Sequence, residues 1–321
     1  MNAPIDLQRF TQNLEIQTPR LIALEIGEVL TRQFPPKEMF LAPWLRKQDL
    51  SMVYATRGVG KTFFALSVAY AVASGGAFLK WRAEKPRRVL YIDGEMSGAE
   101  IQERLKGLVM ANANVEPPEG YFRIITPDAQ DFSLPDLGTI EGQNALDPLI
   151  GDAELIIIDN LSCLMFSAKE NEGEAWMPMA AWALQQRRAG RSVLFVHHAG
   201  KNGTQRGSSR REDLLNVVIA LKHPGDYDTE QGARFEIVFE KKRGLVGDAS
   251  RSIEAALATD ANGKQIWNWS ESEGATLDRV VELKKLGMTN GEIATELGKN
   301  RSTVHRHIKR AVAEGLLGSE T

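Results

Sequence analysis

Cysteine is nearly absent from this chain of 321 residues, which contains Cys163 alone. One cysteine cannot form an intramolecular disulfide, so a disulfide-stapled fold is excluded and a reducing compartment is favoured. Long apolar runs are missing too: none reaches the roughly 18 residues of a membrane span. The first residues, MNAPIDLQRF, lack the basic and apolar pattern of a signal peptide. We therefore expect a cytoplasmic protein that does not enter the membrane.

An excess of charge of one sign is also lacking, since 39 Lys and Arg face 42 Asp and Glu, for a formal net charge of −3. This balance excludes a polycation that coats nucleic acid, so any contact with DNA must come from local basic patches. The hydrophobic content of 43% and charged content of 25% are ordinary for globular proteins. The length then predicts one large domain and a smaller one.

From about residue 41, short apolar runs alternate with helical patterns. The predicted strands are Leu50–Ala55, Arg88–Asp93, Phe122–Thr126, Leu155–Asp159, Ser192–His197 and Phe235–Lys241. The predicted helices between them are Lys61–Ser74, Ser97–Ala111 and Glu174–Ala189. Apolar strands separated by helices predict an α/β fold with a mostly parallel central sheet and right-handed crossovers.

The two ends of the chain differ from this α/β pattern. Residues 1–40 predict an N-terminal arm with a short amphipathic helix within Leu21–Leu30. This arm is expected to pack either on its own main domain or on a neighbouring subunit. The polar stretch SESEGAT after Trp269 is typical of a linker. We thus divide the chain into the arm, a main domain over residues 41–270 and a helical domain over residues 271–321.

The segment ATRGVGKT joins the first predicted strand to the first predicted helix. A glycine-rich turn in that position is a phosphate-binding loop, because outward N–H groups and the helix N-terminus cradle phosphate. Lys61 would reach the β- and γ-phosphates of ATP, and the Thr62 hydroxyl would bind Mg²⁺. Ala55 stands where G-x-x-x-x-G-K-[ST] has its first glycine, and we expect the loop to accept this small residue. The predicted nucleotide contacts are Gly58, Val59, Gly60, Lys61 and Thr62.

Two acidic residues follow buried strands and suit ATP hydrolysis. Asp159 ends the run LIIID, where a carboxylate would face the phosphates and hold a water bound to Mg²⁺. Hydrolysis also needs a base or orienting group for the attacking water. Asn160 directly after Asp159 cannot accept a proton, so Glu95, at the end of YIDGE, is the predicted base. Asp93 is a weaker alternative.

The motifs ATRGVGKT, YIDGE, LIIIDN and VLFVHHAGK together resemble the RecA-like core of RepA-type plasmid replicative helicases, whose wider relatives include the DnaB and RadA/RecA ATPases. The resemblance covers roughly Leu41 to Trp269. It implies a catalytic glutamate at Glu95. It also implies a polar residue that senses the γ-phosphate at the end of the fourth core strand, here His198, with His197 beside it.

Basic segments after these motifs suggest contacts in trans and with DNA. The polar stretch over residues 200–211 predicts a loop with the basic residues Lys201, Arg206, Arg210 and Arg211. We expect this loop to contact the phosphate backbone of DNA or a neighbouring active site, or else to be solvated. The resemblance implies that Arg206 acts in trans. DnaB-like ATPases end the matching strand in Lys-x-Arg-x-Gly, and here Lys241 and Arg243 fit, with the glycine one position early. That spacing predicts both cations on one strand face.

If these cations act in trans, each ATP site needs residues of two subunits. The resemblance implies a ring of six subunits with head-to-tail contacts. One subunit would supply Lys61, Thr62, Glu95 and Asp159, and the next would supply Arg206, Lys241 and Arg243.

The C-terminal segment predicts a helix-turn-helix. A capping box joins Thr289 to Glu292, Gly298 ends the first short helix, and Asn300 or Ser302 caps the second. The second helix has apolar positions Val304, Ile308 and Val312 and is basic elsewhere, as expected for a helix in the DNA major groove. Protein docking is the alternative role. The predicted DNA contacts are Arg301, Thr303, Arg306, His307, Lys309 and Arg310.

These features favour an Mg-ATP-hydrolysing, DNA-dependent motor, and the resemblance implies a ring-forming replicative helicase of a plasmid, phage or mobile element. Two alternatives stay open. One is a recombination or replication-initiation ATPase that does not unwind DNA, and the other is an ATP-switched transcription regulator.

Overall fold

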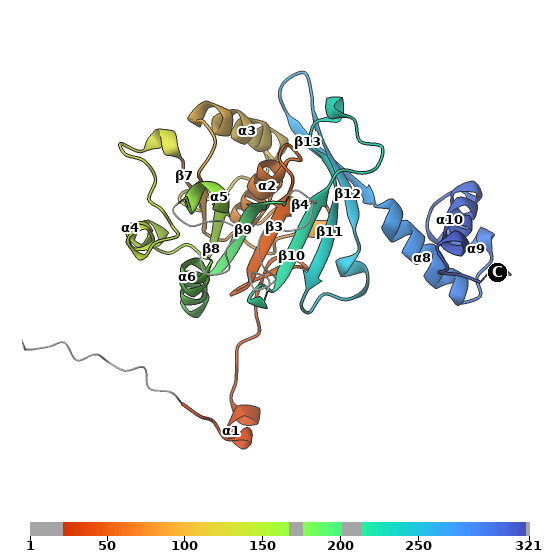
Figure 1. Ribbon diagram of the computed structural model, residues 1–321, viewed down its shortest axis with the longest axis horizontal. Coiled ribbons are helices and arrows are strands. Elements are labelled where there is room, and N and C mark those ends of the chain that lie inside the picture. Colours follow the sequence, from red (N-terminus) through yellow and green to blue (C-terminus); the bar gives the residue numbers. More distant parts are fainter. Residues whose placement is uncertain (1–21, 167–175, 201–212, 319–321) are drawn as a thin grey trace, which may run out of the picture. The chain divides into compact units, whose positions relative to one another are not determined.

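A computed structural model describes residues 22–166, 176–200 and 213–318 of the chain (Figure 1). Contacts divide the chain into a unit over Met1–Pro36 and a unit over Lys37–Thr321. In the described part of the first unit, the predicted arm helix is shorter than expected and runs over Ile26–Thr31 (α1). Ile26 and Leu30 are 78% and 79% exposed, so the described residues of this unit leave the apolar face of α1 uncovered.

The second unit is built on a nine-stranded sheet with the order β13-β12-β11-β10-β3-β9-β8-β6-β7 (Figure 1). Strands β10, β3, β9, β8, β6 and β7 are parallel, and β11, β12 and β13 continue the sheet in antiparallel fashion. The parallel strands are Val217–Lys222 (β10), Leu50–Ala55 (β3), Ser192–His198 (β9), Leu155–Asp159 (β8), Val89–Asp93 (β6) and Phe122–Ile125 (β7). The antiparallel strands are Arg234–Lys242 (β11), Ile253–Thr259 (β12) and Gln265–Glu271 (β13).

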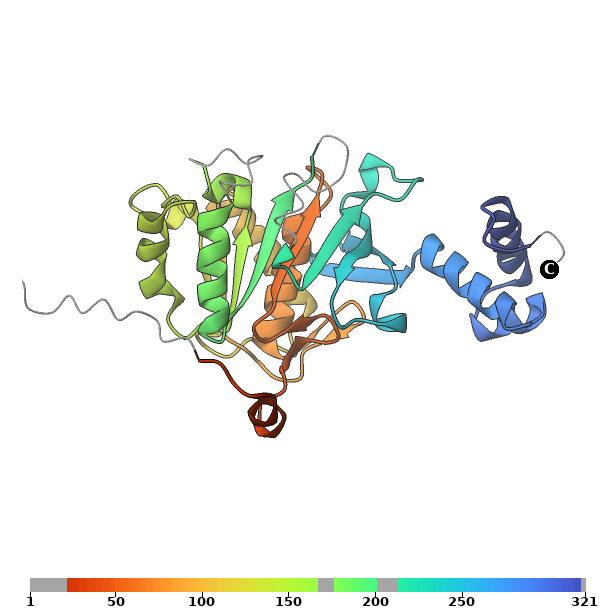
Figure 2. The same ribbon diagram turned by 60° about the horizontal axis from the view of Figure 1, so that its bottom comes forward.

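Helices cover both faces of the parallel part of the sheet (Figure 2). Ile157 of β8 packs in the core with α2 (Lys61–Ser74) and α3 (Gly98–Ala111), and its neighbour Ile158 packs in the opposite core with α4 (Ile140–Ile150) and α6 (Met177–Arg188). Because successive side chains of a strand point to opposite faces, a strand buried on both sides must be apolar throughout. The first four residues of the run LIIID are apolar, and all five are buried.

Short elements complete the main body. They are β1 (Met39–Leu41), β2 (Leu45–Arg46), β4 (Ala77–Phe78), β5 (Trp81–Arg82), the four-residue helix α5 (Leu161–Leu164), and 3₁₀ turns at Pro127–Ala129, Thr229–Gln231 and Gly247–Ser250. Among them, α5 matters most for the site, because it begins directly after the end of β8.

The α/β fold class is confirmed, and each predicted strand and core helix is present, most of them with ends shifted by one to three residues. The predicted linker is wrong. Ser270 and Glu271 are the last residues of β13, and α8 (Glu273–Lys285) begins after Ser272 alone. The Ser272 hydroxyl accepts the Ala275 N–H and caps α8, so polar residues that looked like a flexible joint are a strand end and a helix cap.

Three helices form the C-terminal module with an apolar core of their own: α8, α9 (Asn290–Glu296) and α10 (Arg301–Ala313). The capping box of Thr289 and Glu292 is present at the start of α9. Gly298 follows the end of α9 with φ +60°, and the Asn300 side chain caps α10. The predicted helix-turn-helix is therefore confirmed. In the parts of the chain that the structure describes, no helix is long and apolar enough to cross a membrane.

Candidate functional site

The strand register brings the chemical groups of the site to one edge of the sheet. Asp93 of β6 is paired with Asp159 of β8, and Ala55 of β3 with His198 of β9. These strands are parallel, so their carboxyl ends meet at the same edge. A cavity of about 390 Å³ opens there, lined by Arg57, Gly58, Gly60, Lys61, Thr62, Phe63, Glu95, Met96, Glu100, Arg104, Asp159, Asn160 and His198.

The phosphate loop has the backbone that the sequence predicts. Gly58 and Gly60 have φ of +81° and +114°, which only glycine adopts at low cost. A Cβ on Gly60 would lie 3.0 Å from Ala233 Cβ and 3.1 Å from an edge atom of the Phe235 ring. Ala55 is the last residue of β3 and is not among the described residues with positive φ, so this position does not require glycine.

Lys61 lies at the start of α2 and spans the loop. Its Nζ donates hydrogen bonds to the carbonyl oxygens of Ala55 at 3.2 Å and Thr56 at 2.9 Å. Burial lowers the pKa of Lys61, and the nearby carboxylates of Asp159 and Glu95 oppose this shift. The ammonium group therefore sits in a partly desolvated position, where its attraction for a phosphate is less screened than in water.

Asp159 is held from two sides. The Tyr91 hydroxyl donates to Asp159 Oδ2 at 2.5 Å, and Thr62 makes a further hydrogen bond to the same carboxylate. Burial raises the pKa of Asp159, while the Tyr91, Thr62 and Lys61 groups counteract the rise. A threonine hydroxyl in contact with a carboxylate at a helix start is a set of hard oxygen donors that suits Mg²⁺. The residues thus fit the predicted magnesium role.

Asp93, the alternative base, does not line the cavity. It is 1% exposed and accepts the Met96 N–H at 3.1 Å and, more weakly, the Glu95 N–H at 3.4 Å. Burial first, and the charge of Asp159 second, raise the pKa of Asp93 to about 6. Asp93 therefore supports the turn that carries Glu95, and its burial disfavours direct contact with a substrate water.

Glu95 projects into the cavity with 56% of its side chain exposed. Asn160 Nδ2 donates a 2.5 Å hydrogen bond to Glu95 Oε2, and His198 Nε2 lies 3.8 Å from the same oxygen. His198 is 8% exposed and ends β9. Glu95, Asn160 and His198 therefore form one cluster of side chains in the cavity.

Of the predicted trans cations, the two described ones, Lys241 and Arg243, do not line this cavity. Arg206 lies outside the described residues, as do Lys201, Arg210 and Arg211. Lys241 is on β11, but the strand ends at Lys242, so Arg243 falls in the following turn. Its guanidinium donates to the Asp213 carbonyl oxygen at 3.2 Å. The prediction that Lys241 and Arg243 share one strand face is therefore wrong, because the strand stops before the second cation.

The predicted DNA contacts of the helical module differ in how exposed they are. Arg301, Arg306, Lys309 and Arg310 of α10 are exposed, and Thr303 is half-buried. Arg306 lies 3.2 Å from Glu273, and Arg310 pairs with Glu314 at 2.7 Å. His307 is only 3% exposed, and burial lowers its pKa. The prediction of His307 as a DNA contact is wrong, because it belongs to the module's core.

Sequence reasoning missed several residues that line the cavity: Arg57, Phe63, Met96, Glu100 and Arg104. The Arg104 guanidinium lies over the Phe63 ring, 4.4 Å from its centroid. All five residues lie close to the motifs in the sequence. Arg57 is inside the phosphate loop, and the other four follow a motif residue by nine positions or fewer, on the loop or the first turns of the next helix. Tyr91 and Asn160 lie inside the quoted motifs, but no sequence pattern predicts which residues they form hydrogen bonds with.

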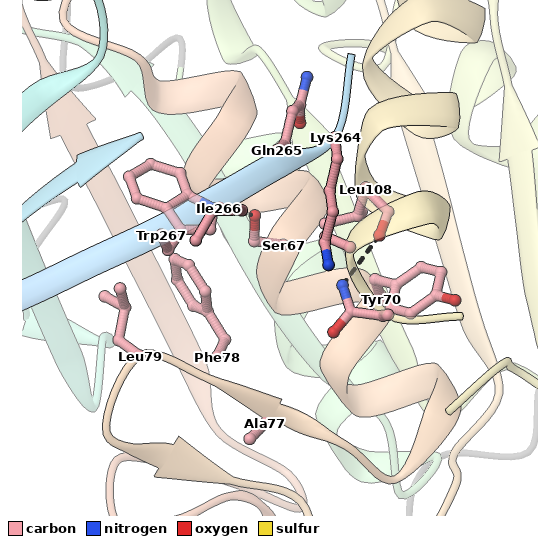
Figure 3. Close-up of a pocket in the computed structure, with 12 residues that line it drawn as sticks. Ser67, Tyr70, Ala77, Phe78, Leu79, Leu108, Lys264, Gln265, Ile266 and Trp267 are labelled. Atoms are coloured by element: carbon pink, nitrogen blue, oxygen red, sulfur yellow. Dashed lines mark hydrogen bonds between the residues drawn. The ribbon is translucent and has the colours of Figure 1, made fainter. Parts of the chain in front are cut away.

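A second cavity, of about 280 Å³, lies away from the phosphate loop between α2, α3 and β13 (Figure 3). Trp267 and Phe78 form one side, and Lys264, Leu108 and Tyr70 form the other (Figure 3). The Trp267 indole N–H donates to Ser67 Oγ at 3.0 Å, and Ser67 in turn donates to the Phe63 carbonyl oxygen at 2.7 Å. This chain of bonds connects β13 to the first turn of α2.

Comparison with known proteins gives two family matches. Residues 15–204 match the AAA_25 model, described as an AAA domain, and residues 284–317 match the HTH_24 model, described as a winged helix-turn-helix DNA-binding domain. Up to residue 318, no described strand follows α10 that could form a wing.

A solved structure of a KaiC-like protein from Pyrococcus horikoshii OT3 matches with a TM-score of 0.48 and 14% identity, over 70% of this chain and 91% of that chain. No curated protein sequence matches the chain.

Proposed function

The chain belongs to the AAA_25 family of AAA domains and carries a C-terminal helix-turn-helix of a DNA-binding type, and on that premise we propose that it is an Mg-ATP-hydrolysing motor that acts on DNA. The observation that carries the proposal is the convergence of four groups on one cavity: Lys61, Thr62, Asp159 and Glu95. They are the cation, the hydroxyl and the two carboxylates that phosphoryl transfer to water requires.

Each group has a defined part in the proposed reaction. The loop amides and Lys61 bind the β- and γ-phosphates and attract the charge that develops as the terminal bond breaks. Thr62 and Asp159 would hold Mg²⁺, which, when bound, neutralises phosphate oxygens and aligns the leaving group. Glu95 orients the attacking water and accepts its proton. His198, close to Glu95, would sense the terminal phosphate through its imidazole.

The finer proposal is a ring, of six subunits by resemblance to RepA-type and DnaB helicases, that moves on single-stranded DNA during replication of a mobile element. In this proposal Lys241 and Arg243, which do not line their own subunit's cavity, act together with Arg206 on the neighbouring site. Residues 271–321 would bind duplex DNA through the exposed basic side of α10. The working division into 1–40, 41–270 and 271–321 belongs to this proposal.

The test of the reaction is ATP turnover with and without single-stranded DNA, in the wild type and in Glu95→Gln. We expect stimulation by DNA and a loss of turnover of about 100-fold or more in Glu95→Gln, with ATP binding retained, because a positioned base contributes that much. Glu103→Gln is the matched control, since Glu103 is an exposed carboxylate on α3 that does not line the cavity. Undiminished turnover in Glu95→Gln would remove it from the base role.

Three further measurements test the finer proposal. Strand displacement on a forked duplex distinguishes a helicase from an ATPase that does not unwind DNA. Mixing Lys61→Ala and Arg243→Ala chains tests shared sites, since partial recovery of turnover requires an intact site assembled from two different subunits. Sequence-selective duplex binding without displacement would instead favour an ATP-switched transcription regulator.

A further inference from the structure

Asn160 lies at a junction between the two acidic motifs of the site. It directly follows Asp159 at the end of β8, is 2% exposed, and is the N-cap of α5. Its Oδ1 accepts the Cys163 N–H at 3.2 Å. The capping bond fixes the amide so that the oxygen points to α5 and the nitrogen to the cavity, because an amide has one accepting and one donating end.

The donating end meets Glu95. Asn160 Nδ2 lies 2.5 Å from Glu95 Oε2, across 65 positions of sequence. Glu95 is more than half exposed, and an exposed glutamate side chain samples several rotamers, so holding it in one of them has an entropic cost. A buried amide that is itself fixed by a helix cap can supply that restriction, and it occupies only one of the two carboxylate oxygens.

We infer that Asn160 is a positioning residue for Glu95: it holds Oε2 so that Oε1 faces the water that attacks ATP. The inference rests on the proposed function, in which Glu95 activates that water. Asn160 contributes no proton transfer of its own, since its amide neither gains nor loses a proton at neutral pH. Its effect is therefore on orientation, which influences turnover and leaves substrate binding largely unchanged.

A purely structural role for Asn160 would be the capping of α5. Asn160→Ser separates the two roles, because serine is also a good N-cap but is too short to reach Glu95. With Asn160→Ser we expect kcat to fall about 10- to 100-fold and KM for ATP to stay within about 2-fold. Asn112→Ser is the matched control, since Asn112 Nδ2 donates to the Leu108 carbonyl oxygen far from the phosphate loop.

A double-mutant cycle decides between positioning and any other effect. In a Glu95→Gln background, Asn160→Ser should lower kcat by less than about 2-fold, because there is no carboxylate left to orient. An equal loss in both backgrounds, an unchanged kcat in the single variant, or an increased kcat would each overturn the inference. The increase would mean that the bond holds Glu95 away from its working position.

Failure of the proposed function gives a different result. If Glu95→Gln alone keeps full turnover, Glu95 is not the base, and this appears before Asn160 is changed. If Glu95→Gln loses turnover but Asn160→Ser does not, the proposed function stands and the positioning role falls. Binding of a fluorescent ATP analogue and thermal unfolding of each variant show that the chains are folded and loaded in every arm of the experiment.

Discussion

The hydroxyl of Tyr91 donates a 2.5 Å hydrogen bond to the carboxylate of Asp159 on the neighbouring strand. Both residues are buried, Tyr91 completely. Its pKa is raised, chiefly by burial and also by the charge of Asp159, so the phenol keeps its proton and remains a donor. One phenol therefore sets the orientation of the carboxylate that we assign to the magnesium site.

Tyr91→Phe removes this donor without changing the shape of the core. We expect the Mg²⁺ concentration that gives half-maximal ATP turnover to rise about 10-fold or more, as for other groups that orient a metal-binding carboxylate. A titration of turnover with Mg²⁺ at fixed ATP checks this. Tyr70→Phe, at a buried tyrosine of α2 outside the nucleotide cavity, should leave the Mg²⁺ dependence unchanged; a similar rise there would contradict the assignment.

Asp93 should make stability depend on pH in an unusual direction. Its pKa rises from 3.8 to about 6 on folding, so the folded chain binds this proton more tightly than the unfolded chain. The stabilisation of the folded state by this proton is complete below pH 3.8 and is lost as the pH rises through about 6. The loss amounts to roughly 3 kcal/mol at most.

Asp93→Asn cannot undergo this titration. Urea unfolding from pH 4 to pH 8 should show the variant gaining stability relative to the wild type as the pH increases. A difference between the two proteins that stays flat over this range would show that Asp93 does not carry the raised pKa.

The two glycines of the phosphate loop should differ in their tolerance of alanine. Gly58 has open space around its missing Cβ, whereas a Cβ at Gly60 would meet Ala233 and Phe235 at 3.0 and 3.1 Å. Gly58→Ala therefore incurs only backbone strain of about 1–2 kcal/mol. Gly60→Ala adds a steric conflict, and we expect it to lower the melting temperature further and to weaken ATP binding more. Equal effects of both changes on unfolding and on ATP affinity would refute this.

Lys309 is exposed on α10 and should contact a DNA phosphate. Lys309→Ala is expected to weaken duplex binding by a similar factor for all sequences and to reduce the slope of log affinity against log salt by about 0.9. Lys285→Ala, which removes the same charge from an exposed position on α8, is the control. If both variants keep the wild-type slope, α10 does not contact DNA backbone, and protein docking becomes the favoured role of the module.

The sequence predicts best where local chemistry alone decides the structure. β3 and α2 have the predicted ends because strand, glycine turn and helix start are all specified by adjacent residues. β12 and β13 were not predicted, since they are half-exposed and their pairing comes from tertiary contacts.

Among the site residues, the partner of Asn160 could not be predicted, because it depends on how two side chains 65 positions apart are rotated. His307 could have been placed correctly. Val304, His307, Ile308 and Ala311 have the i, i+3, i+4, i+7 spacing of one buried helix face.

A single residue, Ser272, separates β13 from α8. Along its length β13 contacts α3, and its Trp267 is bonded to α2, so the two helices that begin at the phosphate loop and beside Glu95 both contact this strand. A shift of either helix that displaces β13 would therefore reach the start of α8 through one residue, Ser272, and not through a long linker.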